Sequence, residues 1–255
     1  MIFATDLDRT MIYSNKFVNK DNINKISVVE TLDGKEISYM SNYAIKELEK
    51  LNKKIYVVPV TTRSVKQFTR INTFKYCEYA ITTNGGTILH NGTVLETWEN
   101  QILKIVKEYK EKMNDVMNVL KNQIFITREP SLIDEKFIFS KTDNIELCEK
   151  FLSENIDLGI WNYTIQSQKV YVIPKEITKS NALDYLRNLL NTKTVIAAGD
   201  GKMDRDMLEY ADYAILPKHG ELYKKEKFKK EKISLVDNGI LSSNDIIKEV
   251  KKYIK

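Results

Sequence analysis

Two aspartates near the start of the chain have a spacing that suits acid–base or metal chemistry. The stretch IFATDLDRTMIYS places Asp6, Asp8 and Thr10 at every second position after an apolar run. Residues two apart share one face of a strand, so both carboxylates can project into the same volume. Such neighbours repel each other unless one is protonated or a cation lies between them. A divalent metal with oxygen ligands removes this repulsion at neutral pH, although strand-end aspartates also serve in turns and caps.

Three later apolar runs are also followed by groups that suit phosphate chemistry. Thr61 follows KIYVVPV, Lys179 follows KVYVIPKEIT, and Asp200 and Asp204 follow TVIAAG. A metal and a lysine neutralise phosphate charge, a hydroxyl holds a phosphate oxygen, and a carboxylate can attack phosphorus. Together with Asp6, these residues predict a phosphoryl-transfer site.

Such a site needs a scaffold that brings separate strand ends to one edge. Short apolar runs alternate with helical stretches through most of the chain, which indicates an α/β fold with a parallel sheet. Runs that are apolar on both faces predict strands with helices on both sides, and ligands bind beyond the carboxyl ends of such strands. The expected strands are IFATDL, KIYVVPV, YAITT, KVYVIP, TVIAAG, YAILP and ISLV.

Two segments depart from this alternation. Residues 25–41 predict a hairpin that turns at Asp33 and Gly34, close after the Asp6 loop, and the sequence leaves its role open. Residues 85–167 predict a small inserted α+β domain, since a long amphipathic helix is followed by a strand–helix–strand pattern. The core would then comprise residues 1–84 and 168–255.

Composition indicates a globular protein without a membrane partner. The 255 residues are 42% hydrophobic and 29% charged, and no apolar run approaches the roughly 20 residues of a membrane span. The sequence begins without a signal-peptide pattern, and its two cysteines lie far apart, so we expect a cytoplasmic protein.

One basic run raises the question of a nucleic-acid partner. The net charge is +5, and much of it lies in KKEKFKKEK at residues 224–232. Acidic residues are interspersed and no arginine-rich or aromatic recognition pattern accompanies the run. We therefore expect a solvated helix face and no nucleic-acid partner. The sequence does not indicate an oligomeric state.

With four motifs in this order, almost the whole chain resembles the haloacid dehalogenase superfamily of aspartate-nucleophile phosphatases. The closest resemblance is to the branch with its cap after the second motif, which includes Cof-like sugar phosphatases, sucrose-phosphate phosphatase and phosphomannomutase. The segment ITTNGGTIL carries an Asn-Gly pair where this branch leaves the core for the cap. The resemblance implies a Rossmann-like parallel-sheet core with helices on both faces, and an inserted α+β cap domain that closes over the substrate.

The resemblance also implies roles for the residues that match its motifs. Asp6 would be the nucleophile that forms an aspartyl-phosphate, and Asp8 the acid that protonates the leaving oxygen and later activates water. Thr61 would bind phosphate through its hydroxyl. Lys179 would neutralise both the nucleophile and the phosphate.

A magnesium site follows from the same resemblance. Asp200 would ligate Mg²⁺, and Asp204 would support the metal directly or through water. Asp6 would add a side-chain oxygen and Asp8 its main-chain carbonyl. Met203 departs from the pattern, because relatives usually have Asn at this position and a thioether cannot replace that group.

Other departures and candidates have simpler interpretations. Arg9 stands where many relatives have a small residue or Asn, and Thr62 replaces a common Gly; both could narrow the site or contact an anionic substrate. Arg63 is expected to pair with an acid and fix its loop. Five further residues are expected to be surface, turn or capping residues without a chemical role: His90, His219, Asp206 and the Gly85–Gly86 pair.

The sequence thus predicts a magnesium-dependent phosphatase that acts on a small phosphorylated metabolite, with a phosphosugar favoured by the resemblance alone. Two alternatives stay open. A phosphomutase would share the first half-reaction and hand the phosphoryl group to a sugar hydroxyl. A non-catalytic protein that binds a ligand or partner would keep the fold, and its support is Met203 and the basic run.

Overall fold

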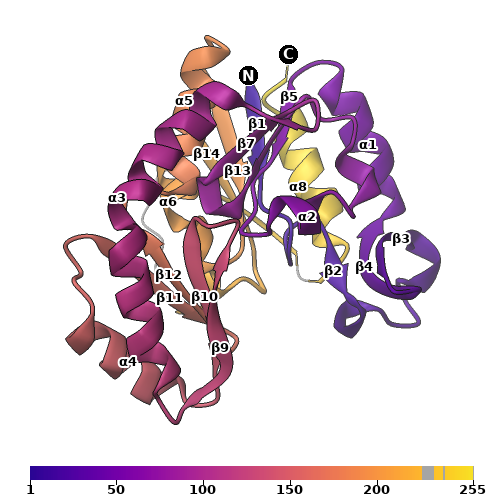
Figure 1. Cartoon of the computed structure of the whole chain (residues 1–255). Coiled ribbons are helices and arrows are strands. Elements are labelled where there is room, and N and C mark those ends of the chain that lie inside the picture. The colour runs from indigo at the N-terminus through magenta and orange to yellow at the C-terminus, as the bar shows by residue number, and fades with distance from the viewer. Residues whose placement is uncertain (226–232, 238, 255) are drawn as a thin grey trace. The chain divides into compact units, whose positions relative to one another are not determined.

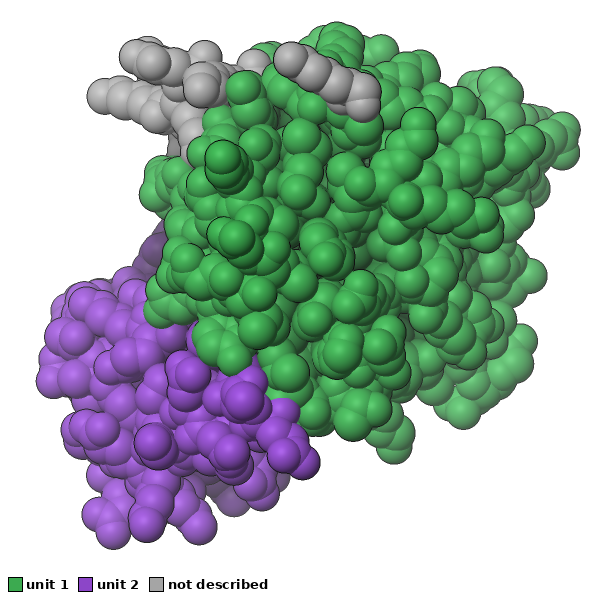
Figure 2. Space-filling model, turned by 90° about the horizontal axis from the view of Figure 1, so that it is seen from above, with its two compact units in different colours: residues 1–95, 179–255 green, residues 96–178 purple. Residues whose placement is uncertain are grey.

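The chain forms two compact units in the computed structural model, which describes residues 1–225, 233–237 and 239–254. The first unit comprises residues 1–95 and 179–255, and the second comprises residues 96–178 (Figure 1; Figure 2). The second unit contains most of the predicted insert, 85–167, whose limits stay a prediction. No helix among the described residues is long and apolar enough to cross a membrane.

A five-stranded parallel sheet, in the order β15-β14-β13-β1-β5, is the centre of the first unit. All four residues of β1 are buried, and Ala4 pairs with Ala197 on one side and Val58 on the other. This is the burial that the apolar runs predict, and the predicted parallel sheet is confirmed. The strands are β1 (Ile2–Thr5), β5 (Tyr56–Pro59), β13 (Val195–Ala198), β14 (Tyr213–Pro217) and β15 (Ile233–Val236).

Helices cover both faces of this sheet (Figure 1). Helices α1 (Asn42–Asn52) and α8 (Ser242–Lys251) pack together, and so do α5 (Lys179–Leu189) and α6 (Arg205–Tyr210). The remaining short helices are α2 (Val65–Phe68), α7 (Glu221–Lys225), and the 3₁₀ turns η1 (Asn15–Phe17), η2 (Ile23–Lys25), η3 (Asn72–Phe74), η4 (Thr83–Gly85) and η5 (Lys202–Asp204). The basic run falls largely at residues 226–232, outside the described residues.

The predicted hairpin is present as β3 (Ile26–Leu32) and β4 (Lys35–Ser41), and β2 (Tyr13–Ser14) pairs with β4. Asp33 and Gly34 both have positive φ, 51° and 73°, as a two-residue turn of this type requires.

A β-bulge interrupts the hairpin ladder at Val29. Val28 pairs with Tyr39 and Glu30 pairs with Ser38, so β3 holds one extra residue at this point. Consecutive strand residues normally point to opposite faces, but here Val29 and Glu30 are both buried. The bulge therefore turns a carboxylate into the interior of the unit.

A small antiparallel sheet completes the first unit. It comprises β6 (Tyr79–Thr82), β7 (Thr87–His90) and β8 (Thr93–Val94). The run YAITT was expected in the main sheet, but it joins β5 only through an isolated parallel bridge between Val60 and Ile81. Along its length β6 pairs with β7 instead.

The second unit packs helices against a four-stranded antiparallel sheet of order β11-β12-β10-β9. The long helix α3 (Glu96–Lys121) places Tyr109, Met113, Val116 and Leu120 in a core with Trp161, as the periodicity predicts. The other elements are β9 (Ile126–Ile133), β10 (Phe137–Thr142), α4 (Ile145–Asn155), β11 (Trp161–Gln166) and β12 (Lys169–Pro174).

A second strand was also expected in the wrong sheet. KVYVIP was expected in the parallel sheet, but it forms β12, which pairs antiparallel with β10 and β11. An interior strand of either sheet type is buried on both faces, so the apolar run carries no information about direction. Ser167 and Gln168, with φ of 48° and 67°, form the tight turn that sets the antiparallel pairing.

Candidate active site

Asp6 lies directly after β1, and both of its carboxylate oxygens are held. Its backbone N–H donates to Ala198 O at 2.8 Å, which extends the ladder between β1 and β13. Thr10 Oγ1 donates to Asp6 Oδ2 at 3.2 Å, and Lys179 Nζ donates to Oδ1 at 2.9 Å. The buried carboxylate therefore has a fixed orientation at the carboxyl edge of the sheet.

Lys179, the first residue of α5, donates hydrogen bonds to groups that follow three strands of the parallel sheet. Its side chain is 1% exposed and donates to Asp6 Oδ1, to Asp204 Oδ1 at 2.6 Å and to Val60 O at 3.3 Å. These acceptors match the three N–H groups of a lysine. Three of the predicted site residues are thus in direct contact.

Asp206 fixes the start of the helix that carries Lys179. Its Oδ2 accepts the Ser180 N–H at 2.8 Å, which satisfies one of the unpaired donors at the beginning of α5. The capping role expected for Asp206 is therefore present, and its burial raises the pKa of the carboxyl.

The loop after β13 is held by hydrogen bonds from its backbone to the Asp204 carboxylate. Its Oδ2 accepts the backbone N–H groups of Asp200 at 3.0 Å and Gly201 at 2.9 Å. A Cβ at Gly199 would lie 2.5 Å from Asp204 Cβ, so only glycine fits at this position. Sequence reasoning missed Gly199, although its place between the strand and the first acid was a usable signal.

The acidic side chains form a group that suits a divalent cation. Asp6, Asp200 and Asp204 each offer an oxygen within 4.8 Å of the others. Asp200 is 3% exposed, and its Oδ2 accepts no hydrogen bond from the residues that the structure describes, although Arg9 Nε lies 3.3 Å away. Three buried carboxylates outnumber the cations Lys179 and Arg9, and an orphaned carboxylate oxygen fits a hard metal ion that prefers oxygen ligands.

Asp8 is placed differently from Asp6. Its side chain is 54% exposed and lies outside the group of three carboxylates. Arg63 holds it through two hydrogen bonds, Nε to Oδ2 at 2.8 Å and Nη2 to Oδ1 at 2.7 Å. The pairing expected for Arg63 is present, and its partner is the predicted acid–base residue.

Thr61 is buried beside the end of β5, next to the Val60 carbonyl that binds Lys179. Its N–H donates to Ile81 O at 2.9 Å, and its Oγ1 accepts the Arg63 N–H at 3.2 Å. These bonds fix the hydroxyl at the edge of the sheet, as a phosphate-binding role requires.

The hairpin contributes a buried carboxylate that holds two arginines. Glu30 has a fully buried side chain and accepts from Arg63 Nη1 at 2.8 Å, from Arg70 Nε at 3.0 Å and from Ser38 Oγ at 2.7 Å. Burial opposes ionisation, but these donors lower the pKa of Glu30. Glu30 thus anchors the arginine that binds Asp8, a role that sequence reasoning left open.

We expect Glu30→Ala to lower the free energy of unfolding by roughly 3 kcal/mol, because Arg63 and Arg70 lose the buried carboxylate that they share. Urea unfolding at neutral pH measures this. Glu36→Ala is the matched control, since Glu36 lies on β4 and is exposed, and its loss should stay within about 0.5 kcal/mol. Equal losses for the two variants would contradict the role of Glu30.

Two of the three buried carboxylates, Asp6 and Asp200, have raised pKa values. Burial, with the charge of Asp204, raises the pKa of Asp6 to about 7, although Lys179 opposes the shift. Burial, with Asp204 and Asp6, raises the pKa of Asp200 to about 8. Burial disfavours the charged form of Lys179, but the two aspartates that it contacts raise its pKa above the usual value.

These shifts predict that the metal-free protein loses stability as the pH rises from about 5 to about 8. In this range the unfolded chain has lost the protons of Asp6 and Asp200, whereas the folded protein retains them, so stability falls with pH. Urea unfolding in EDTA at both ends of the range measures the slope. Greater stability at the alkaline end would contradict the two raised pKa values.

Two histidines differ in their surroundings. His90 stacks on Tyr79 with 4.7 Å between ring centroids and is partly exposed, as a structural residue would be. His219 lies in a turn, as expected, but it is buried rather than on the surface. It contacts Arg9 through Nε2, which lies 2.8 Å from Arg9 O.

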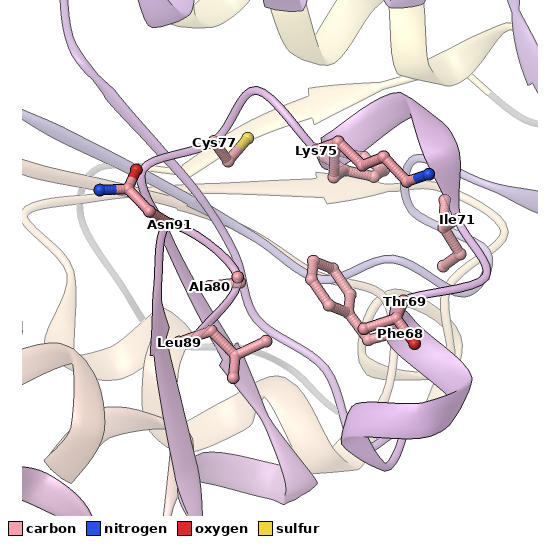
Figure 3. A pocket seen from close by; sticks show the side chains of 10 residues that line it. Phe68, Thr69, Ile71, Lys75, Cys77, Ala80, Leu89 and Asn91 are labelled. Carbon is pink, nitrogen blue, oxygen red and sulfur yellow. The ribbon is translucent and has the colours of Figure 1, made fainter. Parts of the chain in front are cut away.

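A cavity of about 290 Å³ also lies in the first unit (Figure 3). Its lining is mostly apolar and includes Phe68, Phe74 and Leu89, with Lys75 at an exposed position. None of the predicted site residues lines it. An apolar wall does not suit a phosphoester, so the carboxylate–lysine group is the candidate active site.

Comparisons with solved structures identify similar folds. The sucrose-phosphatase of Synechocystis sp. PCC6803, solved with sucrose and phosphate, is 14% identical with a TM-score of 0.70, and the match covers 99% of this chain and 97% of that one. A haloacid dehalogenase-like hydrolase of B. subtilis is 13% identical with a TM-score of 0.61, covering 100% and 99%. BT1666 of Bacteroides thetaiotaomicron, a phosphatase of the same superfamily, is 14% identical with a TM-score of 0.59, covering 98% and 94%.

Sequence comparison gives the family. No curated protein matches the chain. The family model of haloacid dehalogenase-like hydrolases matches residues 99–242, which is more than half of the sequence. The predicted resemblance is therefore confirmed, and the chain belongs to the haloacid dehalogenase-like hydrolase family.

Proposed function

We propose that this hydrolase is a magnesium-dependent phosphatase that cleaves a small phosphorylated metabolite through an aspartyl-phosphate on Asp6. The observation that carries the proposal is the buried contact of Lys179 with Asp6 and Asp204, beside the orphaned oxygen of Asp200. A carboxylate held between a hydroxyl and an ammonium group is oriented for attack, and the surplus of negative charge suits a cation.

In the first step an oxygen of Asp6 forms a bond to phosphorus while the bond from phosphorus to the leaving oxygen breaks. Asp8 gives its proton to that oxygen. Both Asp8 oxygens accept from Arg63 in the structure, so Asp8 gives up at least one of these two hydrogen bonds when it carries the proton that it donates. Lys179 offsets negative charge on the nucleophile and the phosphoryl group, and the Thr61 hydroxyl donates to a phosphoryl oxygen.

In the second step a water molecule gives a proton to Asp8 and its oxygen attacks phosphorus. The bond between phosphorus and Asp6 breaks, which releases inorganic phosphate and restores the carboxylate. Asp6, Asp200 and Asp204 would hold Mg²⁺, which supplies positive charge for the phosphoryl oxygens and keeps the carboxylates ionised.

A phosphosugar is the proposed substrate class. Its support is the similarity in fold to a sucrose-phosphatase solved with sucrose and phosphate. The division into a catalytic core and an inserted cap is part of the same proposal. So is action in the cytoplasm, which the free thiols of Cys77 and Cys148 support.

A screen of phosphorylated metabolites for magnesium-dependent phosphate release tests the proposal, with Asp6→Asn as the blank. We expect release of inorganic phosphate from at least one phosphosugar by the unaltered chain only. Isomerisation of a phosphosugar without phosphate release would replace the proposal with a phosphomutase. Absence of turnover throughout, with tight binding of a macromolecule, would replace it with a non-catalytic role.

A further inference from the structure

Arg9 occupies a backbone position that fixes where its side chain begins. It lies between Asp8 and Thr10 with φ of 67°, a conformation that few residues other than glycine adopt. Its N–H donates to Ile12 O at 2.8 Å, so the loop closes tightly behind it. The strain of this conformation is tolerated where surrounding contacts impose it.

His219 supplies those contacts. Arg9 Nη2 donates to His219 O at 3.1 Å, and Gly239 N–H donates to His219 Nδ1 at 3.0 Å. Because Nδ1 accepts, Nε2 carries the proton and donates to Arg9 O at 2.8 Å. His219 itself packs against Tyr13 and Phe17, with ring centroids 5.8 and 6.0 Å away. The arginine is thus held at its backbone and at one guanidinium nitrogen.

The remaining guanidinium edge faces the candidate metal site. Arg9 Nε lies 3.3 Å from Asp200 Oδ2, and both atoms are buried. Neither makes a hydrogen bond within the described part of the chain, so the contact is an attraction between charges without hydrogen-bond geometry. Such a contact neutralises a buried carboxylate, yet a cation of higher charge can replace it at small cost.

We propose that Arg9 is an internal counter-cation of Asp200 that competes with the divalent metal and sets its affinity. The inference rests on the proposed metal site. Without metal, the guanidinium offsets the charge of Asp200 when that carboxylate is ionised. With metal, its positive charge stays tethered near the ion by the His219 contacts and opposes binding. A variant with a neutral side chain at this position should therefore bind Mg²⁺ more tightly than the unaltered chain. Without metal, that variant should be less stable.

Isothermal titration of the full chain with MgCl₂ tests this in four forms: unaltered, Arg9→Gln, Arg9→Lys and Arg187→Gln. We expect Arg9→Gln to bind Mg²⁺ about 10-fold more tightly, because a unit charge close to the ion is removed. Arg9→Lys keeps the charge and should stay within about 3-fold of the unaltered chain. Arg187→Gln removes a partly exposed charge that pairs with Asp212 and should change nothing.

Thermal unfolding supplies a second readout. In EDTA the midpoint of Arg9→Gln should lie below that of the unaltered chain, and saturating Mg²⁺ should close the gap. If turnover needs Mg²⁺ but Arg9→Gln binds Mg²⁺ no more tightly than the unaltered chain does, only the proposed role of Arg9 is overturned. Absence of Mg²⁺ binding by both forms overturns the proposed metal site as well.

Discussion

Asp6→Asn should abolish phosphate release, with a loss of about 10⁴-fold or more against the best substrate of the screen. An amide nitrogen is not a nucleophile, and the amide oxygen is far weaker than a carboxylate. The fold should persist, because the amide keeps the shape of the side chain and its oxygen can accept from Lys179, as Asp6 Oδ1 does at 2.9 Å. Steady-state phosphate release measures the loss.

Stability separates this result from simple unfolding. Asp6→Asn removes one of three buried carboxylates whose oxygens lie within 4.8 Å of one another, so at about pH 8 the metal-free variant should be at least as stable as the unaltered chain. Asp184→Asn makes the same chemical change at an exposed residue of α5 and should leave turnover intact. Substantial phosphate release by Asp6→Asn would remove Asp6 as the nucleophile.

Lys179→Met should have the largest effect on stability. It leaves Asp6 and Asp204 buried without their common cation, and breaking such a pair costs roughly 3–5 kcal/mol. The loss should be largest near pH 8 and smaller near pH 5, where protonation of Asp6 removes part of the unpaired charge. Turnover should fall as well, because the cation proposed to offset the charge of the phosphoryl group is removed.

Urea unfolding at both pH values measures the effect of Lys179→Met. Lys248→Met is the matched control, since Lys248 lies on α8 and pairs with Asp245 at the surface. Its loss should be small at either pH. If Lys179→Met lost the same stability at both pH values, the missing ammonium charge would not be the cause, and the effect would belong to packing.

The geometry of the site was predictable where it depended on strand ends. Asp6 and Asp200 are far apart in sequence, yet their proximity follows from a general property of parallel sheets, whose ligand sites lie at the carboxyl ends of the strands. Lys179 follows β12 of the antiparallel sheet, so its contact with Asp6 does not follow from this property. The carboxylates, the hydroxyl and the lysine at these positions then indicated phosphoryl transfer. The spacing did not predict that the two aspartates of the first motif have different surroundings. Asp6 is buried, whereas Asp8 is exposed and accepts hydrogen bonds from Arg63.

Other features depended on three-dimensional contacts that leave little trace in a sequence. Burial does not alternate along β3 at Glu30, because a β-bulge turns this side chain inward. A bulge has no strong sequence signal. The burial of His219 depends on its contact with Arg9. The direction of β12 was missed because apolar residues fill interior strands of both sheet types.

The division of the first unit into two stretches of sequence has a consequence for synthesis on the ribosome. β1 is flanked by β5, which is made early, and by β13, which is made only after residues 96–178. Until then the nascent chain exposes one edge of β1 and carries Asp6 without its ammonium partner. The catalytic centre therefore assembles late, and a chain that stops before Lys179 has an open strand edge that can pair with other chains.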